Sequence, residues 1–353
     1  MESDPMSRRT RRLVPLSQRA VPETVRARMH APLVVVLGSP AEVVNLLRAG
    51  DGAEAVCYQM DLYQAERLRE ALAKANINAK VTTAPDLWDL PAEFQTAIYM
   101  PARGGERELK IDVIEQAFHV LRPGGALVVW SSYETDPFFP SLLKKVFGRP
   151  HEVRTEINTV LWAPRAGDRP RRRHEVTFQA RVLDGPSCRF VSRPGVFTYG
   201  RFDDGARALA ETAALKPGDR VLDLGCGCGV AGVFASRQTG PEGHIAFVDS
   251  NVRAVALTDL NARANGVTSF QAVASSRVEG LEGGPFDVAL ANPPYIADHS
   301  VARLFIERAR ELLRPRGRFY LVTKQPEPVA ELVADTFGAV DGVPRRGYTI
   351  LVA

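Results

Sequence analysis

Residues 221–229 read Val-Leu-Asp-Leu-Gly-Cys-Gly-Cys-Gly, an apolar run that ends in an acid and continues into a glycine-rich turn. A stretch with helical periodicity, Val230–Arg237, follows without a break. Glycine reaches positive φ and lets a ligand approach the backbone closely, and the free N–H groups at the start of a helix favour anionic groups. The stretch therefore predicts a strand, a ligand-binding turn and a helix, which is a unit of a doubly wound α/β sheet.

Short β-branched runs alternate with amphipathic stretches on both sides of this turn, which is the pattern of a parallel sheet covered by helices. In the second half we expect strands at Arg220–Leu224, Ile245–Val248, Phe270–Val273, Phe286–Ala291 and Arg318–Val322, and helices at Val230–Arg237, Val252–Ala264 and Val301–Leu313. In the first half we expect strands at Leu33–Leu37, Ala55–Tyr58, Lys80–Thr83, Thr96–Met100 and Ala126–Trp130, and helices near Ala41–Leu47, Leu62–Ala75 and Leu109–Leu121.

The two halves also match each other. Ala97–Gly125, ending Leu-Arg-Pro-Gly-Gly, falls on Ala289–Gly317, ending Leu-Arg-Pro-Arg-Gly, at a constant offset of 192. This repeat predicts a duplication, and hence an α/β protein with two tandem Rossmann-like, doubly wound sheets. We expect a basic flexible tail at 1–31, one domain at 32–163, a basic linker at 164–174 and a second domain at 175–353.

Composition excludes several classes of protein. The chain has 353 residues, of which 45% are hydrophobic and 24% charged, enough for about two domains of ~150 residues. No apolar run approaches the ~20 residues that span a bilayer, no secretory signal is present, and four cysteines are too few for a disulfide scaffold. We therefore expect a cytoplasmic protein that makes no membrane contact.

Positive charge is concentrated in two segments. Residues 1–31 hold seven arginines against three acids, and the linker holds five arginines against one acid. Flexible basic segments suit long-range attraction to phosphate, so the tail and the linker are candidate RNA contacts, although a solvated tail explains the same pattern.

An acid at the end of the next strand completes a candidate cofactor site. Asp249 lies 20 residues after Gly229, where its carboxylate can accept both hydroxyls of a ribose. With Asp223, Gly225, Gly227 and Gly229 it predicts an adenosine-containing cofactor at the carboxyl edge of the sheet. The same glycines also satisfy the dinucleotide fingerprint, so the turn alone leaves the cofactor open.

The fourth strand of the second half is followed by Asn292, Pro293, Pro294 and Tyr295. Together with the glycine turn and the ribose acid, this tetrapeptide resembles the signature of class I S-adenosylmethionine (SAM)-dependent methyltransferases that modify planar nitrogen. The resemblance implies SAM as cofactor and a duplicated methyltransferase fold.

The chemistry of the tetrapeptide agrees with that resemblance. An exocyclic amine on a base or amide is a poor nucleophile because its lone pair is delocalised. The side-chain oxygen of Asn292 and the carbonyl of Pro293 can accept its two N–H bonds and aim the lone pair at a methyl donor. Prolines fix φ, which makes the turn rigid, and Tyr295 offers a face for a planar substrate. The alternative without catalysis is that Asn292 only caps a helix in a rigid turn.

The resemblance covers Phe190–Ala353 and narrows to the small-domain methyltransferase superfamily of RNA guanine-N2 methyltransferases. In that family the segment before the sheet lies over the cofactor mouth, which makes Phe197 and Asp203 candidate substrate-pocket residues. Two departures stand out. Tyrosine at 295 is also the form found in protein-glutamine methyltransferases, and the expected adenine contacts, Ser275 and Ser276, lack a carboxylate.

The first half lacks the glycine turn, the acid and the tetrapeptide that form the candidate site of the second half. Pro40 replaces a glycine of the turn, Met100-Pro-Ala-Arg stands opposite the Asn292 tetrapeptide, and Asp249 aligns with Met60. A bacterial family of 16S ribosomal RNA guanine-N2 methyltransferases is similarly built, with a degenerate first copy. We hypothesise that residues 32–163 bind no cofactor and instead support the second half or hold RNA.

The sequence thus predicts a SAM-dependent methyltransferase that acts on guanine N2 of ribosomal RNA, free or in a subunit. Protein-glutamine N5 and adenine N6 methylation remain alternative reactions, and an RNA-binding assembly factor is the alternative without catalysis. Cys226 and Cys228 have no other Cys or His at ligand spacing, so we expect no metal site.

Overall fold

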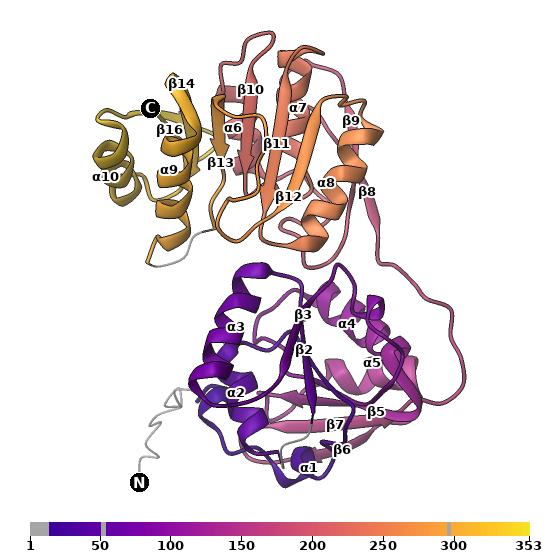
Figure 1. Cartoon of the computed structure of the whole chain (residues 1–353). Helices are drawn as coiled ribbons and strands as arrows, with labels where there is room; N and C mark the ends of the chain where they lie inside the picture. The colour runs from indigo at the N-terminus through magenta and orange to yellow at the C-terminus, as the bar shows by residue number, and fades with distance from the viewer. Residues whose placement is uncertain (1–13, 51–53, 295–297) are drawn as a thin grey trace, which may run out of the picture.

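The computed structural model describes residues 14–50, 54–294 and 298–353. Within these residues the chain forms two α/β domains (Figure 1), each built on a seven-stranded sheet. Five strands of each sheet are parallel, and the other two are joined to one edge by antiparallel pairing. The two sheets have the same spatial order of strands, so the expected fold class, two tandem Rossmann-like doubly wound sheets, is confirmed.

The first sheet runs β3-β2-β1-β4-β5-β7-β6. Its strands are β1 (Leu33–Val36), β2 (Ala55–Gln59), β3 (Lys80–Thr83), β4 (Phe94–Tyr99), β5 (Leu121–Ser131), β6 (His151–Arg154) and β7 (Thr159–Pro164). Its helices are α2 (Pro40–Arg48), α3 (Leu62–Lys74), α4 (Arg107–Val120) and α5 (Phe138–Phe147), with a 3-10 turn η2 at Leu87–Asp89. All four residues of β1 are buried, because α2 and α3 cover one face of the sheet and α4 and α5 the other.

The second sheet runs β12-β11-β10-β13-β14-β16-β15. Its strands are β10 (Arg220–Leu224), β11 (His244–Asp249), β12 (Phe270–Ala274), β13 (Phe286–Ala291), β14 (Leu313–Thr323), β15 (Asp341–Arg345) and β16 (Tyr348–Val352). Its helices are α6 (Asp204–Thr212), α7 (Val230–Thr239), α8 (Val252–Ala264), α9 (Ser300–Leu312) and α10 (Pro326–Phe337). Our patterns did not predict the antiparallel strands, α6, α10, or the separate hairpin of β8 (Val176–Ala180) and β9 (Cys188–Ser192).

Part of the expected basic tail is folded. Within residues 14–31, η1 (Leu16–Gln18) and α1 (Glu23–Arg26) pack against the first domain, and Leu16 and Val25 are buried in its core. The expectation of a flexible tail over 1–31 is therefore wrong for 14–31, because apolar side chains spaced between the arginines fill the surface beside α2. Residues 1–13 lie outside the described part.

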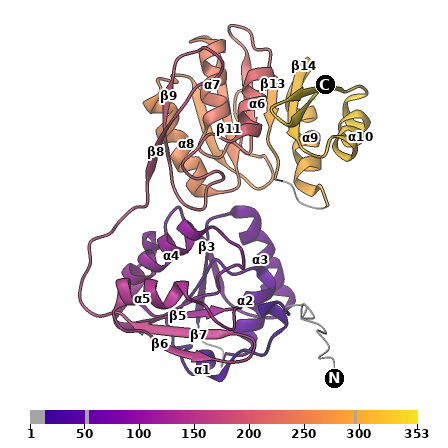
Figure 2. The ribbon, with the colours of Figure 1, turned by 180° about the vertical axis from the view of Figure 1, so that it is seen from behind.

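The linker arginines are used within the protein. Arg165 donates to the carbonyl of Leu121, and Arg169 donates to the carbonyls of residues 145 and 146 at 2.7 and 2.8 Å. The guanidinium of Arg171 lies 5.6 Å from the centre of the Trp88 ring. The segment between β7 and β8 bows outward beside the first domain in Figure 2, and these arginine contacts tie it to that domain.

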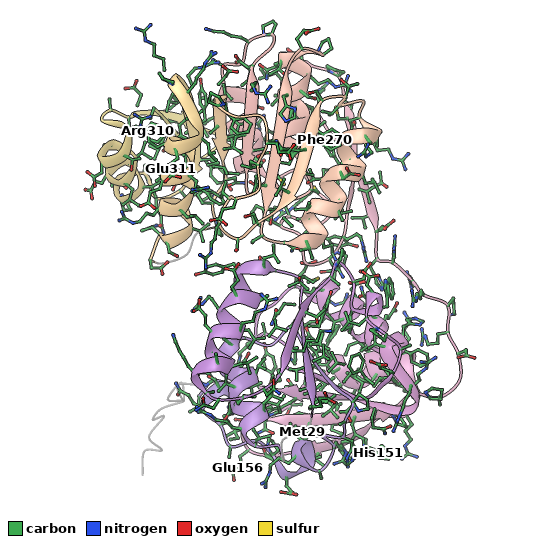
Figure 3. The ribbon with its side chains drawn as sticks, viewed as in Figure 1. Met29, His151, Glu156, Phe270, Arg310 and Glu311 are labelled. Atoms are coloured by element: carbon green, nitrogen blue, oxygen red, sulfur yellow. The ribbon has the colours of Figure 1, made fainter. Side chains whose placement is uncertain are left out.

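The two domains meet through equivalent loops, those that follow β2 and β11. An antiparallel bridge joins Asp61 to Asn251, Leu62 N donates to Ser250 O at 2.8 Å, and Val252 N donates to Met60 O at 2.9 Å. Asp61 caps α3 and Asn251 caps α8, so the same position of each copy lies at the contact. The carboxyl edges of the two sheets therefore face each other. Met29, His151 and Glu156 lie at the end of the first domain that is turned away from the second (Figure 3).

A buried network of charges lies beside these loops. Arg253 of α8 is 1% exposed and donates to Asp112 at 2.8 Å, to Asp86 at 3.0 Å and to the carbonyl of Pro85 at 2.7 Å. Arg193 pairs with Asp86 through both terminal nitrogens. Burial alone would raise the pKa of Asp86, but its bonds and charges with Arg193 and Arg253 hold that pKa below its ordinary value. Ion pairs that cross the contact thus fix the orientation of the domains.

Two kinds of feature are missing from the part of the chain that the structure describes. None of its helices is long and apolar enough to cross a membrane. No three of its His, Cys, Asp and Glu side chains come together in a way that could hold a metal ion.

Candidate cofactor and substrate site

A cavity of about 580 Å³ opens at the carboxyl ends of β10, β11, β12 and β13. Its wall includes Gly225 and Gly227 of the glycine turn, Asp249 at the end of β11, Ser275 and Ser276 after β12, and Asn292, Pro293 and Pro294 after β13. Phe197 also lines it. The fold thus brings together residues from four separate strands that the sequence analysis had assigned to one site.

The glycine turn borders the cavity with backbone in a conformation that favours glycine. Gly225 and Gly227 adopt φ of 72° and 56°, in the left-handed region that favours glycine. A Cβ on Gly225 would lie 3.1 Å from the Phe305 ring, whereas one on Gly227 would meet nothing within 4 Å in the described structure. Gly227 therefore presents bare backbone to the open cavity.

Asp249 ends β11 at the wall of the cavity. Its Oδ2 accepts from Gly227 N at 2.9 Å, and its Oδ1 accepts from Asn251 N at 2.8 Å. Burial raises the pKa of Asp249 to about 6, although these backbone bonds favour the charged form. Each oxygen retains a lone pair, so the carboxylate can accept two hydroxyls from the cavity.

Two predicted cofactor residues, Asp223 and Gly229, are not among the residues that line the cavity. Asp223 is 3% exposed, and its Oδ2 accepts from Gly232 N at 2.9 Å in the first turn of α7. Burial raises its pKa to about 7. Gly229 precedes α7 with φ of 86°. Both residues therefore support the conformation of the glycine turn and do not face the cavity.

Asn292 is held by a residue from a different part of the domain. Its Nδ2 donates to Asp203 Oδ2 at 3.3 Å, and the same oxygen accepts from Ala206 N at 2.8 Å to cap α6. An ionised carboxylate only accepts hydrogen bonds, so the amide nitrogen of Asn292 must face Asp203 and its oxygen must face away. Asp203, expected in the substrate pocket, does not line the cavity and instead orients Asn292.

The remaining predicted residues differ in their surroundings. Ser275 Oγ accepts from Glu279 N at 2.9 Å, and Ser276 Oγ donates to Glu66 of α3 at 2.7 Å, so both hydroxyls already have protein partners. Phe197 is 64% exposed at the cavity. Tyr295, predicted to stack on the substrate, lies outside the described residues.

Three cavity residues come from the first domain and were missed by sequence reasoning: Asp61, Tyr63 and Gln64. Phe305 and Leu304 of α9 were missed as well. The hydrophobic pattern predicted a helix at this place, but it did not indicate which of its residues line the cavity. Nothing in the sequence indicated that α3 of one copy would contact the site of the other.

The equivalent place in the first domain is filled by its own side chains. Because Asp61 and Asn251 hold the same helix-capping position, the counterpart of Asp249 is Gln59, and the sequence alignment with Met60 is off by one residue. Gln59 is buried and donates to Gly38 O at 2.8 Å. A Cβ on Gly38 would lie 2.7 Å from Val43 and 2.9 Å from Met100. The turn that carries Gly38 is therefore packed against side chains.

Comparisons with known proteins agree with this geometry. Residues 187–352 match the methyltransferase small domain family, which confirms the resemblance read from the second half. A ribosomal RNA small subunit methyltransferase C of Pseudomonas entomophila is 31% identical over 188 residues, which cover 50% of this chain and 55% of the relative. Its namesake in Chromohalobacter salexigens is 37% identical over 155 residues, covering 42% and 45%. The chain thus spans about half the length of these curated relatives.

A solved structure matches this chain over both domains. It is a 16S rRNA N2 methyltransferase of T. thermophilus in complex with AdoMet and guanosine, with a TM-score of 0.75 and 22% identity over 95% of this chain and 92% of that one. The duplicated fold is therefore shared over nearly the whole chain.

Proposed function

We propose that this protein is a SAM-dependent methyltransferase that modifies the exocyclic N2 of guanine in ribosomal RNA. The observation that carries the proposal is the pair Asp203 and Asn292. It fixes an amide oxygen at the wall of a cavity that is also lined by the Asp249 carboxylate and by a bare glycine turn.

The residues present fit SAM. Asp249 would accept the ribose hydroxyls, and the open backbone at Gly227 leaves room for the methionine part. When bound, SAM supplies a methyl group on a positively charged sulfur. Asn292 Oδ1 and the carbonyl of Pro293 would accept the two N–H bonds of the amine, which turns the nitrogen lone pair toward that methyl group.

RNA is the partner that we propose for the whole protein, in line with the names of its relatives. A guanine in a helix would have to leave its stack to reach the cavity. Because four linker arginines bind the first domain, we assign RNA contact chiefly to the tail and to surface arginines. Long-range attraction of this kind predicts an RNA affinity that falls steeply with salt.

The test incubates the protein and methyl-labelled SAM with ribosomal RNA, ribosomal subunits and release factor in separate reactions. We expect label in RNA or a subunit, and N2-methylguanosine after digestion. Label in release factor would favour protein-glutamine methylation, and N6-methyladenosine would favour the adenine reaction. SAM binding without label in any arm would favour an assembly factor that does not catalyse methyl transfer.

The Asn292→Ala variant tests the catalytic assignment within this assay. Loss of a donor or acceptor that acts on the transition state costs about 10²-fold or more in turnover, and SAM affinity should remain near that of the wild type. Asn265→Ala is the matched control, because Asn265 is the C-terminal cap that follows α8 and does not line the cavity. Unchanged turnover in Asn292→Ala would refute the assignment.

A further inference from the structure

The first domain contributes directly to the cavity of the second. Asp61, Tyr63 and Gln64, at the beginning of α3, line the same cavity as Asp249 and Asn292. The first domain has therefore kept a surface at the active site of its neighbour while its own glycine turn is filled.

The start of α3 is held against two segments of the second domain. Ser250 Oγ donates to Asp61 Oδ2 at 2.6 Å, and the backbone bonds between residues 60–62 and 250–252 fix the same turn. One turn further along α3, Glu66 accepts from Ser276 Oγ at 2.7 Å and lies 3.6 Å from Arg277. Tyr63 and Gln64 thus lie on the helix between the ends of β11 and β12.

The order of strands separates this side of the cavity from the reacting side. β10 lies between β11 and β13, and Asn292 follows β13. A nucleoside whose ribose binds Asp249 places its base toward β12, because the glycine turn after β10 occupies the other direction. The base therefore approaches Tyr63 and Gln64, and the amine to be methylated lies on the far side of β10.

The second domain supplies aliphatic, small and polar side chains at this place: Val248, Ser250, Asn251, Ala254, Ser275, Ser276 and Val278. None of these described residues carries an aromatic ring, and the hydroxyls of Ser275 and Ser276 already have protein partners. A planar base needs an apolar face against its ring and groups that both donate and accept at its edge. Tyr63 has such a face, and the amide of Gln64 can donate and accept.

We infer that α3 of the first domain forms the adenine-binding wall of the SAM site, with the Tyr63 ring against the purine and the Gln64 amide at its edge. This inference rests on the proposed function, because it assumes that SAM occupies the cavity. It gives the degenerate copy a part in cofactor binding at its neighbour's site.

The test measures SAM affinity of the full-length protein by calorimetry. Loss of one aromatic stacking partner costs about 1–3 kcal/mol per base, so Tyr63→Ala should raise the Kd for SAM roughly 5- to 150-fold. Tyr63→Phe should bind nearly as well as the wild type, because it keeps the ring. Gln64→Ala should reduce the preference for adenosine over inosine as a competitor, since inosine lacks the amino group.

Tyr133→Ala is the matched control. Tyr133 is a half-buried tyrosine of the first domain that lies under an arginine, as Tyr63 does, but it does not line the cavity. Its removal should leave SAM affinity unchanged. Urea midpoints of all variants identify any that are merely destabilised, and Tyr63→Leu provides a second, apolar replacement that lacks the ring.

The outcomes separate the inference from the proposed function. If the wild type binds SAM and Tyr63→Ala binds it equally well, the wall assignment is wrong and the proposed function stands. If Tyr63→Ala instead raises only the KM for RNA, the ring meets the target base and the adenine assignment is overturned. If the wild type binds no SAM, the proposed function itself fails.

Discussion

Replacing Arg253 by methionine removes the charge at the centre of the contact between the two domains and keeps most of the length of the side chain. The guanidinium of Arg253 is bonded to Asp86, Asp112 and two backbone carbonyls. After the change Asp86 keeps Arg193, whereas Asp112, which is fully buried, keeps only the amide of Gln116. The variant therefore leaves one buried carboxylate without a cation.

Removing one partner of a buried ion pair costs about 3–5 kcal/mol, out of ~5–15 kcal/mol for a typical domain. With a urea dependence of ~3 kcal/mol per molar, a loss of ~4 kcal/mol lowers the urea midpoint by about 1.3 M. We also expect weaker SAM binding, because Tyr63 reaches the cavity only when the domains are held together.

Urea unfolding followed by tryptophan fluorescence and by far-UV circular dichroism measures this effect. All three tryptophans lie in the first domain, so fluorescence reports that domain and dichroism reports both. In the wild type we expect the two transitions to coincide, and in Arg253→Met we expect them to separate as the domains lose their coupling.

Arg263→Met is the control on the same helix. Arg263 pairs with Asp259 at 2.8 Å but is 69% exposed, and exposed ion pairs contribute about 0–1 kcal/mol. Adding Asp112→Asn to Arg253→Met should restore part of the loss, since it removes the unpaired charge. Equal midpoints for the two single variants would refute the argument that buried charge fixes the domain contact.

Three further predictions concern the second domain. Gly232→Ala should lower stability by about 1–3 kcal/mol, because its Cβ would lie 2.2 Å from the Phe247 ring, and an unchanged melting temperature would contradict that packing. Burial raises the pKa of Asp249 from 3.8 to about 6. Between those pH values the folded protein keeps a proton that the unfolded chain has lost, so this group lowers the free energy of unfolding as the pH rises through that window. The urea midpoint of Asp249→Asn should therefore rise relative to that of the wild type between pH 4 and pH 7, and a difference that does not change with pH would contradict the raised pKa. Asp203→Ala should cost about 1 kcal/mol as a lost helix cap and reduce turnover about tenfold with an unchanged SAM Kd, because it frees the amide of Asn292, and a change in Kd alone would argue against this orienting role.

Local features of the sequence determined the fold and much of the candidate site. The apolar run that ends at Leu224, the glycines after it and the period of the next helix each follow from interactions within a few residues, so the strand, the turn and the helix could be predicted. The offset between the halves predicted a second sheet of the same order. Asp249 and Asn292 could be assigned to one edge because the carboxyl ends of parallel strands meet there.

Only the tertiary structure decided which residues of the two domains meet at the cavity and at the contact between the domains. Asp203 bonds to Asn292 across 89 positions of the chain, Arg253 reaches Asp112 across 141, and Tyr63 lines a cavity built mainly by the other domain. Such contacts depend on how two folded sheets face each other, and that is set by buried ion pairs and backbone bonds between distant loops. Periodicity and spacing along the chain carry no information about this orientation, because they record only which face of its own element each residue occupies.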